Sequence, residues 1–172
     1  MFLANHYYLP VTLAETEKID FIKHIIKHKS EVNFINQLND YLQKENNFFE
    51  QFDWWYFSKI DETLDEVYIP YYQPKTNRIE KFKPDFIFWL KKRDNYTILF
   101  IDPKGTEYSD AYRKIEGYKR MFEGKKFTHD NFTLDVKLLL KTDDISKTLE
   151  VKEYEEYWFD NFDSIKNKII KN

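Results

Sequence analysis

The chain has 172 residues, a formal net charge of −3 and no cysteine. This length suits a single domain with a sizeable core, and the lack of cysteine excludes disulfides and thiolate metal sites. The chain is not globally basic, so any contact with nucleic acid must use a local patch. There is no signal-peptide pattern and no apolar run of about 18 residues, so we expect a cytoplasmic protein that makes no membrane contact.

The N-terminal part is predicted to be helical. Residues 12–28 carry a stripe of isoleucines at helical spacing. A second helix is expected over 31–45, with Ser30 as its cap. Its apolar face would consist of Val32, Ile35, Leu38 and Leu42. We therefore expect 1–29 to form a helical arm packed on the core, and 30–172 to form one globular unit.

Four strands are predicted in the middle of the chain. Residues 53–60 are rich in aromatic side chains, which favour strands. Residues 66–72 form a weaker strand that belongs at an edge, because Pro70 has no N–H to donate to a ladder. The two strongest apolar runs, 84–91 and 96–103, are expected to be buried strands.

The last third of the chain returns to helices. A helix is predicted from a cap at Ser109 or Asp110 to Gly124, followed by a buried strand over 133–142 and a closing helix over 157–171. This order of elements predicts an α/β or α+β fold, in which a central mixed β-sheet is flanked by helices on both faces.

Two of the apolar strands carry an acid at one end. Asp85 opens the first strand, and Asp102 lies near the end of the second, before Pro103 and Lys104. Burying a charge costs several kcal/mol unless it is paired or binds a metal, so these positions indicate a site. The connection 92–95 is short and rich in turn-forming residues, which predicts an antiparallel hairpin.

The length of the hairpin loop decides how the acids meet. A two-residue loop at Arg93–Asp94 places Asp85 directly opposite Asp102, and a loop one residue further along places it opposite Lys104. In both registers the three side chains lie on one face, because side chains alternate along a strand. A three-residue loop would pair Asp85 with Pro103 and break the arrangement.

Two close carboxylates repel each other, and a divalent cation that prefers oxygen ligands relieves the repulsion. Mg²⁺ fits because it binds one or two carboxylates, keeps several waters and accepts phosphate oxygens; Mn²⁺ can substitute. The Pro103 carbonyl can be a further ligand, and Lys104 can orient or deprotonate an attacking water. The alternative is an Asp–Lys ion pair that closes the hairpin, and the hairpin alone leaves both possibilities open.

The stretches KPDFIFWL and FIDPKG resemble the signature of PD-(D/E)xK nucleases, here Pro84-Asp85 and then Asp102-Pro103-Lys104. They are similar in particular to the C-terminal endonuclease domain of the helicase-bearing, DEAD/DEAH-box subunit of type III restriction enzymes. The resemblance covers residues 30–141. That family also places a glutamate on a preceding helix, in a pattern E-x-x-F-x-x-x-L that is matched by Glu31, Phe34 and Leu38.

The resemblance implies a restriction-endonuclease-like core and a Mg²⁺-dependent DNA endonuclease, as part of a type III-like restriction system directed against phage. It implies that Asp85 and Asp102 bind the metal, that Lys104 positions the water, and that Glu31 completes the acidic cluster. The implied partners are double-stranded DNA, a helicase or ATPase region in cis or in trans, and a methyltransferase subunit. Aspartate at 102, where glutamate is commoner, and proline at 103 depart from the family pattern.

Basic residues follow the second acid-bearing strand on the next predicted helix: Arg113, Lys114, Lys119 and Arg120. They can contact the phosphates of a nucleic acid. The alternative is an ordinary solvated face of a helix.

The sequence is also compatible with a protein that does not cut DNA. The chain can be a catalytically silent module of nuclease fold that binds DNA or docks a helicase partner, and RNA or branched DNA can replace duplex DNA as substrate. Glu45 and Glu50 are rivals of Glu31 for the helical glutamate, and Glu31 can equally serve as a helix-capping residue.

Overall fold

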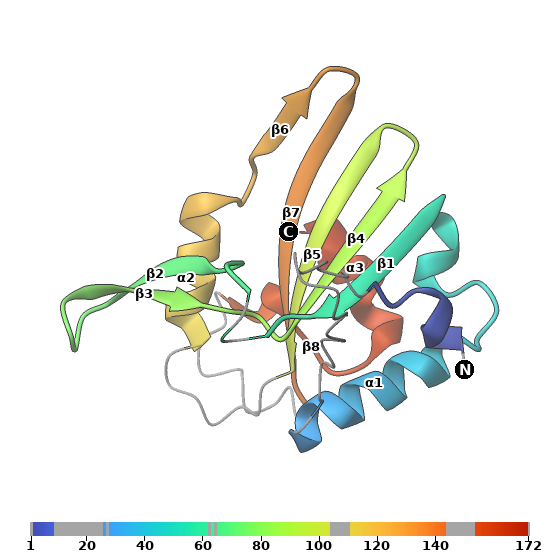
Figure 1. Cartoon of the computed structure of the whole chain (residues 1–172), viewed down its shortest axis with the longest axis horizontal. Helices are drawn as coiled ribbons and strands as arrows, with labels where there is room; N and C mark the ends of the chain where they lie inside the picture. The colour runs from blue at the N-terminus through green and yellow to red at the C-terminus, as the bar shows by residue number, and fades with distance from the viewer. Residues whose placement is uncertain are drawn as a thin grey trace, which may run out of the picture.

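The computed structural model describes residues 2–8, 26, 28–61, 63, 65–103, 111–143 and 154–171. A six-stranded mixed sheet forms the centre of the molecule, and helices cover both of its faces (Figure 1). The structure thereby confirms the predicted α+β class and the central mixed sheet. Among the described residues, the longest helix has 13 residues, and none is long and apolar enough to cross a membrane.

The central sheet has the strand order β1-β4-β5-β7-β6, and the short strand β8 also pairs with β7. Neighbouring strands are antiparallel except for β5 with β7 and β7 with β8, which are parallel. The crossover from β5 to the parallel strand β7 contains the helix α2 (Ala111–Met121) and the strand β6. The strands are β1 (Trp54–Lys59), β4 (Phe86–Lys92), β5 (Asn95–Pro103), β6 (Lys126–His129), β7 (Phe132–Lys141) and β8 (Trp158–Phe159).

One face of the sheet packs against α1 (Lys29–Tyr41), η2 (Phe48–Gln51), η4 (Phe162–Ser164) and α3 (Ile165–Lys171). The short N-terminal helix η1 (Phe2–Asn5) adds Leu3 to the same core. We call this the α1-face core; its buried members include Phe34, Leu38, Phe86, Phe88, Leu99, Ile101 and Leu139.

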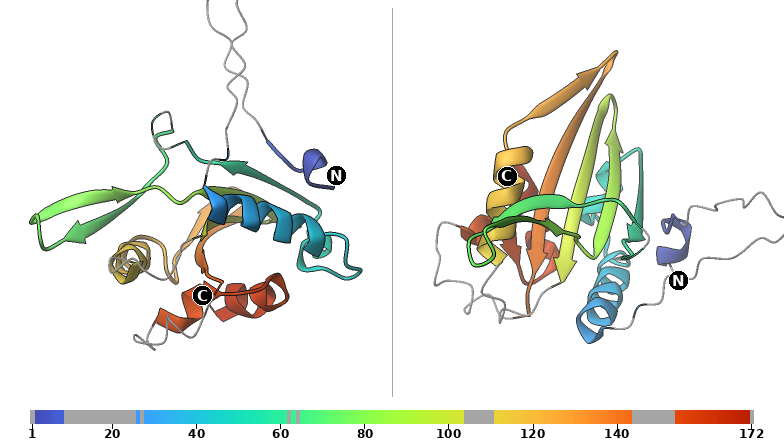
Figure 2. Two further views of the ribbon diagram at one scale, coloured as in Figure 1. Left: turned by 90° about the horizontal axis from the view of Figure 1, so that it is seen from below. Right: turned by 60° about the vertical axis from the view of Figure 1, so that its left-hand side comes forward.

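The other face packs against α2 (Ala111–Met121) and a separate two-stranded sheet, β2 (Ile69–Gln73) with β3 (Arg78–Phe82). The β2–β3 hairpin extends beyond the central sheet, beside α2 (Figure 2). We call this the α2-face core; its buried members include Ile69, Phe82, Ile87, Phe100, Ile115, Tyr118, Leu138 and Leu140.

The β2–β3 hairpin makes its closest contact with α2 at a glycine. A Cβ atom at Gly117 would lie 2.5 Å from the carbonyl oxygen of Pro70 and 2.9 Å from the Cβ of Tyr71. Only glycine permits this approach of the two backbones. Deeper in the same core, the Tyr118 hydroxyl donates a hydrogen bond of 3.0 Å to the carbonyl oxygen of Val136 and ties α2 to β7.

The N-terminal predictions require two corrections. Ser30 lies inside α1 and does not cap it; the N-cap is His28, whose side chain makes no capping hydrogen bond. Val32 is 41% exposed, because the buried stripe of α1 consists of Phe34, Leu38 and Tyr41. The helix predicted over 12–28 lies almost entirely outside the described residues. The division into an arm and a globular unit stays a prediction.

The middle and end of the chain differ from expectation at two points. The strand predicted over 66–72 exists as β2, but it pairs with an unpredicted strand, β3, outside the central sheet. The closing helix predicted over 157–171 begins only at Ile165, because Trp158 and Phe159 form β8 against β7. The predicted strands 53–60, 84–91, 96–103 and 133–142 are all confirmed.

Candidate active site

The acid-bearing hairpin has the predicted two-residue loop. Lys92 lies opposite Asn95, which leaves Arg93 and Asp94 as the loop, and the strands are antiparallel. Arg93 adopts a positive φ of 55°, which is common for the first residue of such a loop. The register of the two strands is therefore one of the two that the sequence allows for a site formed by both acids.

This register brings Asp85 and Asp102 together. Phe86 lies opposite Ile101, so continuing the ladder by one residue sets Asp85 opposite Asp102. Asp85 lies just before β4, but its carbonyl accepts a 2.8 Å hydrogen bond from the N–H of Ile60, so its backbone continues the pairing with β1. Directly opposed Cβ atoms in an antiparallel pair are about 4.5–5.5 Å apart.

The two aspartates lie on the face that α2 covers. Phe100 belongs to the α2-face core and Ile101 to the α1-face core, so Asp102 points to the same side as Phe100. Asp102 is fully buried, and Leu140 of β7 lies beside it in register. Asp85 is half-buried. A buried carboxylate attracts a cation strongly, because the low dielectric strengthens that attraction.

Glu31 lies at the same end of the sheet but on the opposite face. It occupies the first turn of α1 and is 2% exposed, and its Oε1 is 3.0 Å from the Nζ of Lys59, the last residue of β1. The Lys59 ammonium also lies 5.8 Å from the ring centroid of Phe86, in the α1-face core. The other carboxylate oxygen, Oε2, is buried and has no hydrogen-bond partner within the described part of the chain.

The structure therefore brings together two of the predicted site residues and places the third apart from them. No group of three or more histidine or acidic side chains that could hold a metal ion occurs among the described residues. Lys104 lies outside the described residues, so its position on the face of Asp102 stays a prediction. Pro103 is the buried last residue of β5, and the role of its carbonyl also stays a prediction.

Sequence reasoning missed two lysines at this end of the sheet. Lys59 ends β1, and Lys141 ends β7, where it lies beside Pro103 in register. Lys141 is only 4% exposed; its Nζ is 2.9 Å from the carbonyl oxygen of Thr142 and 3.1 Å from the Oδ1 of Asp143. The signal that could have found both lysines is the one that singled out Asp102, a charged residue that ends an apolar strand.

The two opposed aspartates fit Mg²⁺. They offer hard oxygen ligands from one face, and Mg²⁺ in proteins is held by one or two carboxylates, with water and substrate phosphate in its other positions. A cluster of three acids is not needed for this geometry. Both acids lie at the end where β5 leads into residues 104–110 and α2, the lower end in Figure 1.

The four basic residues of α2 differ in their surroundings. Lys114 packs its ammonium 4.6 Å from the ring centroid of Phe82, and Lys119 lies 5.6 Å from that of Tyr154. Arg113 is half-buried, with its guanidinium 4.9 Å from the ring centroid of Tyr112. Arg120 is exposed. The helix lies on the same face as Asp102, but the four cations do not form one uniform solvated stripe.

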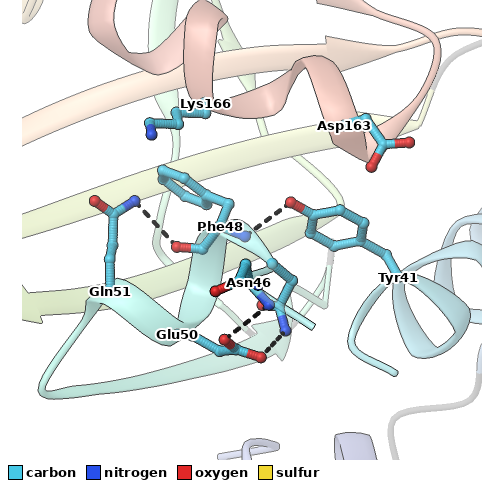
Figure 3. A pocket seen from close by; sticks show the side chains of 8 residues that line it. Tyr41, Asn46, Phe48, Glu50, Gln51, Asp163 and Lys166 are labelled. Atoms are coloured by element: carbon cyan, nitrogen blue, oxygen red, sulfur yellow. Dashed lines mark hydrogen bonds between the residues drawn. The ribbon is translucent and has the colours of Figure 1, made fainter. Parts of the chain in front are cut away.

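A polar pocket of about 480 Å³ lies at the other end of α1 (Figure 3). Its groups satisfy one another: the N–H of Phe48 donates to the Tyr41 hydroxyl at 2.8 Å, and Gln51 donates to the carbonyl of Phe48 at 3.0 Å. Burial raises the pKa of Tyr41, which keeps the hydroxyl protonated. Because Tyr41 is ten residues from Glu31, the pocket lies about 15 Å along the helix from the acidic end. These contacts stabilise the connection from α1 to η2.

The fold is mixed α+β, and the candidate site consists of two aspartates that lie opposite each other at one end of the central sheet. The chain belongs to the YagJ family, whose family model matches residues 22–166 and so spans both aspartates and Glu31. No curated protein and no solved structure matches the chain.

Proposed function

We propose that this chain is a Mg²⁺-dependent DNA endonuclease of the PD-(D/E)xK type that hydrolyses phosphodiester bonds. The observation that carries the proposal is the register of β4 and β5, which, continued by one residue beyond Phe86 and Ile101, sets Asp85 opposite a fully buried Asp102. A lysine, Lys104, follows two residues after the second acid. A carboxylate pair followed by a lysine is the combination that such a reaction requires.

The order of elements supports the same proposal. A helix with Glu31 precedes the antiparallel strands β1, β4 and β5, and α2 with the parallel strand β7 follows them. The family that the sequence resembles has a helical glutamate, a PDF strand, an acid-x-Lys strand and a helix in this sequence order. We therefore include a restriction-endonuclease-like core in the proposal.

In this proposal each residue has a distinct role. Asp85 and Asp102 hold Mg²⁺, which when bound polarises a phosphate oxygen and lowers the pKa of water. Burial of Asp102 lowers the local dielectric and strengthens its attraction for a cation. Lys104 orients the attacking water and offsets the negative charge that develops on the phosphate. Glu31 lies on the opposite face of the sheet, so in this proposal it anchors α1 through Lys59 and does not bind the metal.

A second candidate function has its own supporting observation. The carboxylate of Glu31, which the family resemblance assigns to the acidic cluster, instead faces the ammonium of Lys59 at 3.0 Å, on the opposite face of the sheet from Asp102. A catalytically silent module of nuclease fold that binds DNA, or docks a helicase partner, would tolerate this pairing. It would bind DNA without cutting it.

The proposed cellular setting is a type III-like restriction system in the cytoplasm. With 3 glycines, this chain has no Gly-rich phosphate loop. A helicase or ATPase region, in cis or in trans, would therefore move the DNA, and a methyltransferase subunit would protect host sites. Duplex DNA is the substrate of such a system.

The test is cleavage of supercoiled plasmid in Mg²⁺ and in Mn²⁺, with EDTA as the metal-free control. We expect nicked or linear product from the wild type, and at least a 100-fold (order-of-magnitude) slower reaction from Lys104→Ala and Asp102→Asn. Asp94→Asn is the matched control, because this exposed aspartate lies in the loop at the far end of the same two strands. DNA binding without cleavage would favour the silent module, and equal rates for wild type and Asp102→Asn would refute the site.

A further inference from the structure

A second pocket, of about 300 Å³, lies between α2 and the β2–β3 hairpin. The hairpin is a two-stranded sheet of its own that lies beside α2 and extends beyond the central sheet (Figure 2). The close approach at Gly117 fixes the spacing of the two walls, because its backbone lies against Pro70. The pocket is therefore a built feature of the fold.

Large apolar side chains are exposed around this pocket. Tyr72 is 47% exposed, Ile79 65% and Tyr112 37%, and all three line it. Tyr72 and Ile79 lie opposite each other on the hairpin, and Tyr112 lies in the first turn of α2. Tyrosines clustered around one exposed pocket are typical of a ligand-binding surface.

The charge of the lining is positive. Two arginines, Arg113 and Arg120, line the pocket with one acid, Glu116, which already accepts a 2.6 Å hydrogen bond from Tyr154. Within the described part of the chain the guanidinium of Arg120 has no hydrogen-bond or ion-pair partner. Arginine binds phosphate through two parallel hydrogen bonds, so a phosphate is the complementary ligand group.

The hairpin tip adds further positive charge beside the pocket. Lys75 and Arg78 are both exposed near the turn. The nearby Lys81 is engaged elsewhere, because its ammonium lies 4.3 Å from the ring centroid of Tyr68 and 3.8 Å from a carboxylate oxygen of Glu66. The surface thus combines exposed tyrosines with cations, which suits a chain that carries both planar bases and phosphates.

We propose that this pocket binds one unpaired nucleotide of a DNA strand, with its base against Tyr72 and Tyr112 and its phosphate on Arg120. A base offers its face to an aromatic ring only when it is unpaired or extruded, so a regular duplex does not satisfy the pocket. The volume is at the small end of ligand sites and accommodates one nucleotide.

The pocket lies close to the candidate active site along the chain. Ile79 precedes Asp85 by six residues, so the two Cα atoms are at most about 20 Å apart. At a rise of about 3.4 Å per nucleotide, the bound nucleotide lies within about six nucleotides of the phosphate that is cut. This placement rests on the proposed function, and it makes duplex DNA that contains a single-stranded stretch near the cut a better substrate than uninterrupted duplex DNA.

The test is fluorescence anisotropy of a labelled oligothymidylate and of a labelled duplex of equal length, in EDTA so that no cleavage occurs. We expect tighter binding of the single strand, and a loss of at least about fivefold for Tyr72→Ala and for Arg120→Ala, since stacking of one base contributes about 1–3 kcal/mol. Tyr72→Phe keeps the ring and should bind as the wild type does. Tyr56→Ala, a similarly exposed tyrosine on β1, is the matched control.

The proposal is refuted if duplex and single strand bind equally, or if Tyr72→Ala binds as tightly as Tyr56→Ala. Failure of the proposed function looks different. In that case no plasmid or oligonucleotide is cut in Mg²⁺, but the single strand still binds and Tyr72→Ala still weakens it. If DNA is cut and Tyr72→Ala changes neither binding nor the rate on a substrate with unpaired nucleotides, the pocket proposal alone fails.

Discussion

Replacing Lys59 by methionine should destabilise the protein through Glu31. The substitution keeps a long side chain against Phe86 but removes the ammonium that faces the Glu31 carboxylate at 3.0 Å. The side chain of Glu31 is only 3% exposed, so its charge would remain buried without a cation. Removing one partner of a buried ion pair is strongly destabilising, because the other partner is left as a buried charge without a counter-charge.

The magnitude follows from how buried the pair is. Breaking a fully buried pair costs about 3–5 kcal/mol, and the 14% exposure of the Lys59 side chain places this pair near the lower value, at about 3 kcal/mol. For a chain of this length that corresponds to a fall in Tm of roughly 6–12 °C. Adding Glu31→Gln to Lys59→Met removes the stranded charge, so we expect the double variant to recover most of the loss.

The assay is urea unfolding followed by tryptophan fluorescence, since Trp55 is buried in the α1-face core. Measurements in EDTA and in Mg²⁺ separate two roles of Glu31, because a metal bound by its carboxylate would restore stability to Lys59→Met. A loss below about 0.5 kcal/mol, or a double variant no more stable than the single one, would show that the pair is not coupled in this way.

Two further predictions concern the α2 face. Gly117→Ala should push the β2–β3 hairpin off α2, because the new Cβ would lie 2.5 Å from the Pro70 carbonyl oxygen. Overpacking costs about 1–3 kcal/mol and the higher helix propensity of alanine returns about 1 kcal/mol, so we expect a net loss of up to about 2 kcal/mol. A Tm above that of the wild type would contradict the contact. Burial raises the pKa of Tyr118 in the folded state above the value of about 10 in the unfolded chain. The stability that the protonated hydroxyl contributes is therefore complete below about pH 10 and is lost at higher pH. In urea titrations above about pH 10, the free energy of unfolding of Tyr118→Phe should therefore fall less steeply with pH than that of the wild type. Part of the fall remains, because burial also raises the pKa of Tyr157. Equal falls with pH in the two proteins would contradict this.

The parts that the sequence predicts best are those set by local chemistry. The face on which the two acids lie depends only on loop length and alternation, so a shared face for Asp85 and Asp102 can be predicted without knowledge of any tertiary contact. The sequence left open which of two loop positions is used, and the structure has the loop at Arg93 and Asp94. The strand 133–142 is equally clear, because a long apolar run between polar segments favours a buried strand.

The parts that could not be predicted depend on tertiary packing. In α1 both Val32 and Phe34 fit an apolar stripe, and the rotation of the helix is decided by the aromatic core, where Phe34 stacks on Phe86 at 4.8 Å. Strand β3, RIEKF, buries only Phe82 and is a strand because β2 pairs with it. The pairing of Glu31 with Lys59 joins elements that are distant in sequence, so no spacing rule finds it.

The most direct test of the proposed metal site is a crystal soaked in Mn²⁺ and measured at the manganese absorption edge. We expect an anomalous peak between the carboxylates of Asp85 and Asp102, at a metal–oxygen distance of about 2.1 Å, and no peak in crystals of Asp102→Asn. A wild-type crystal in saturating Mn²⁺ with no peak at these two carboxylates would contradict the site and, with it, the proposed endonuclease.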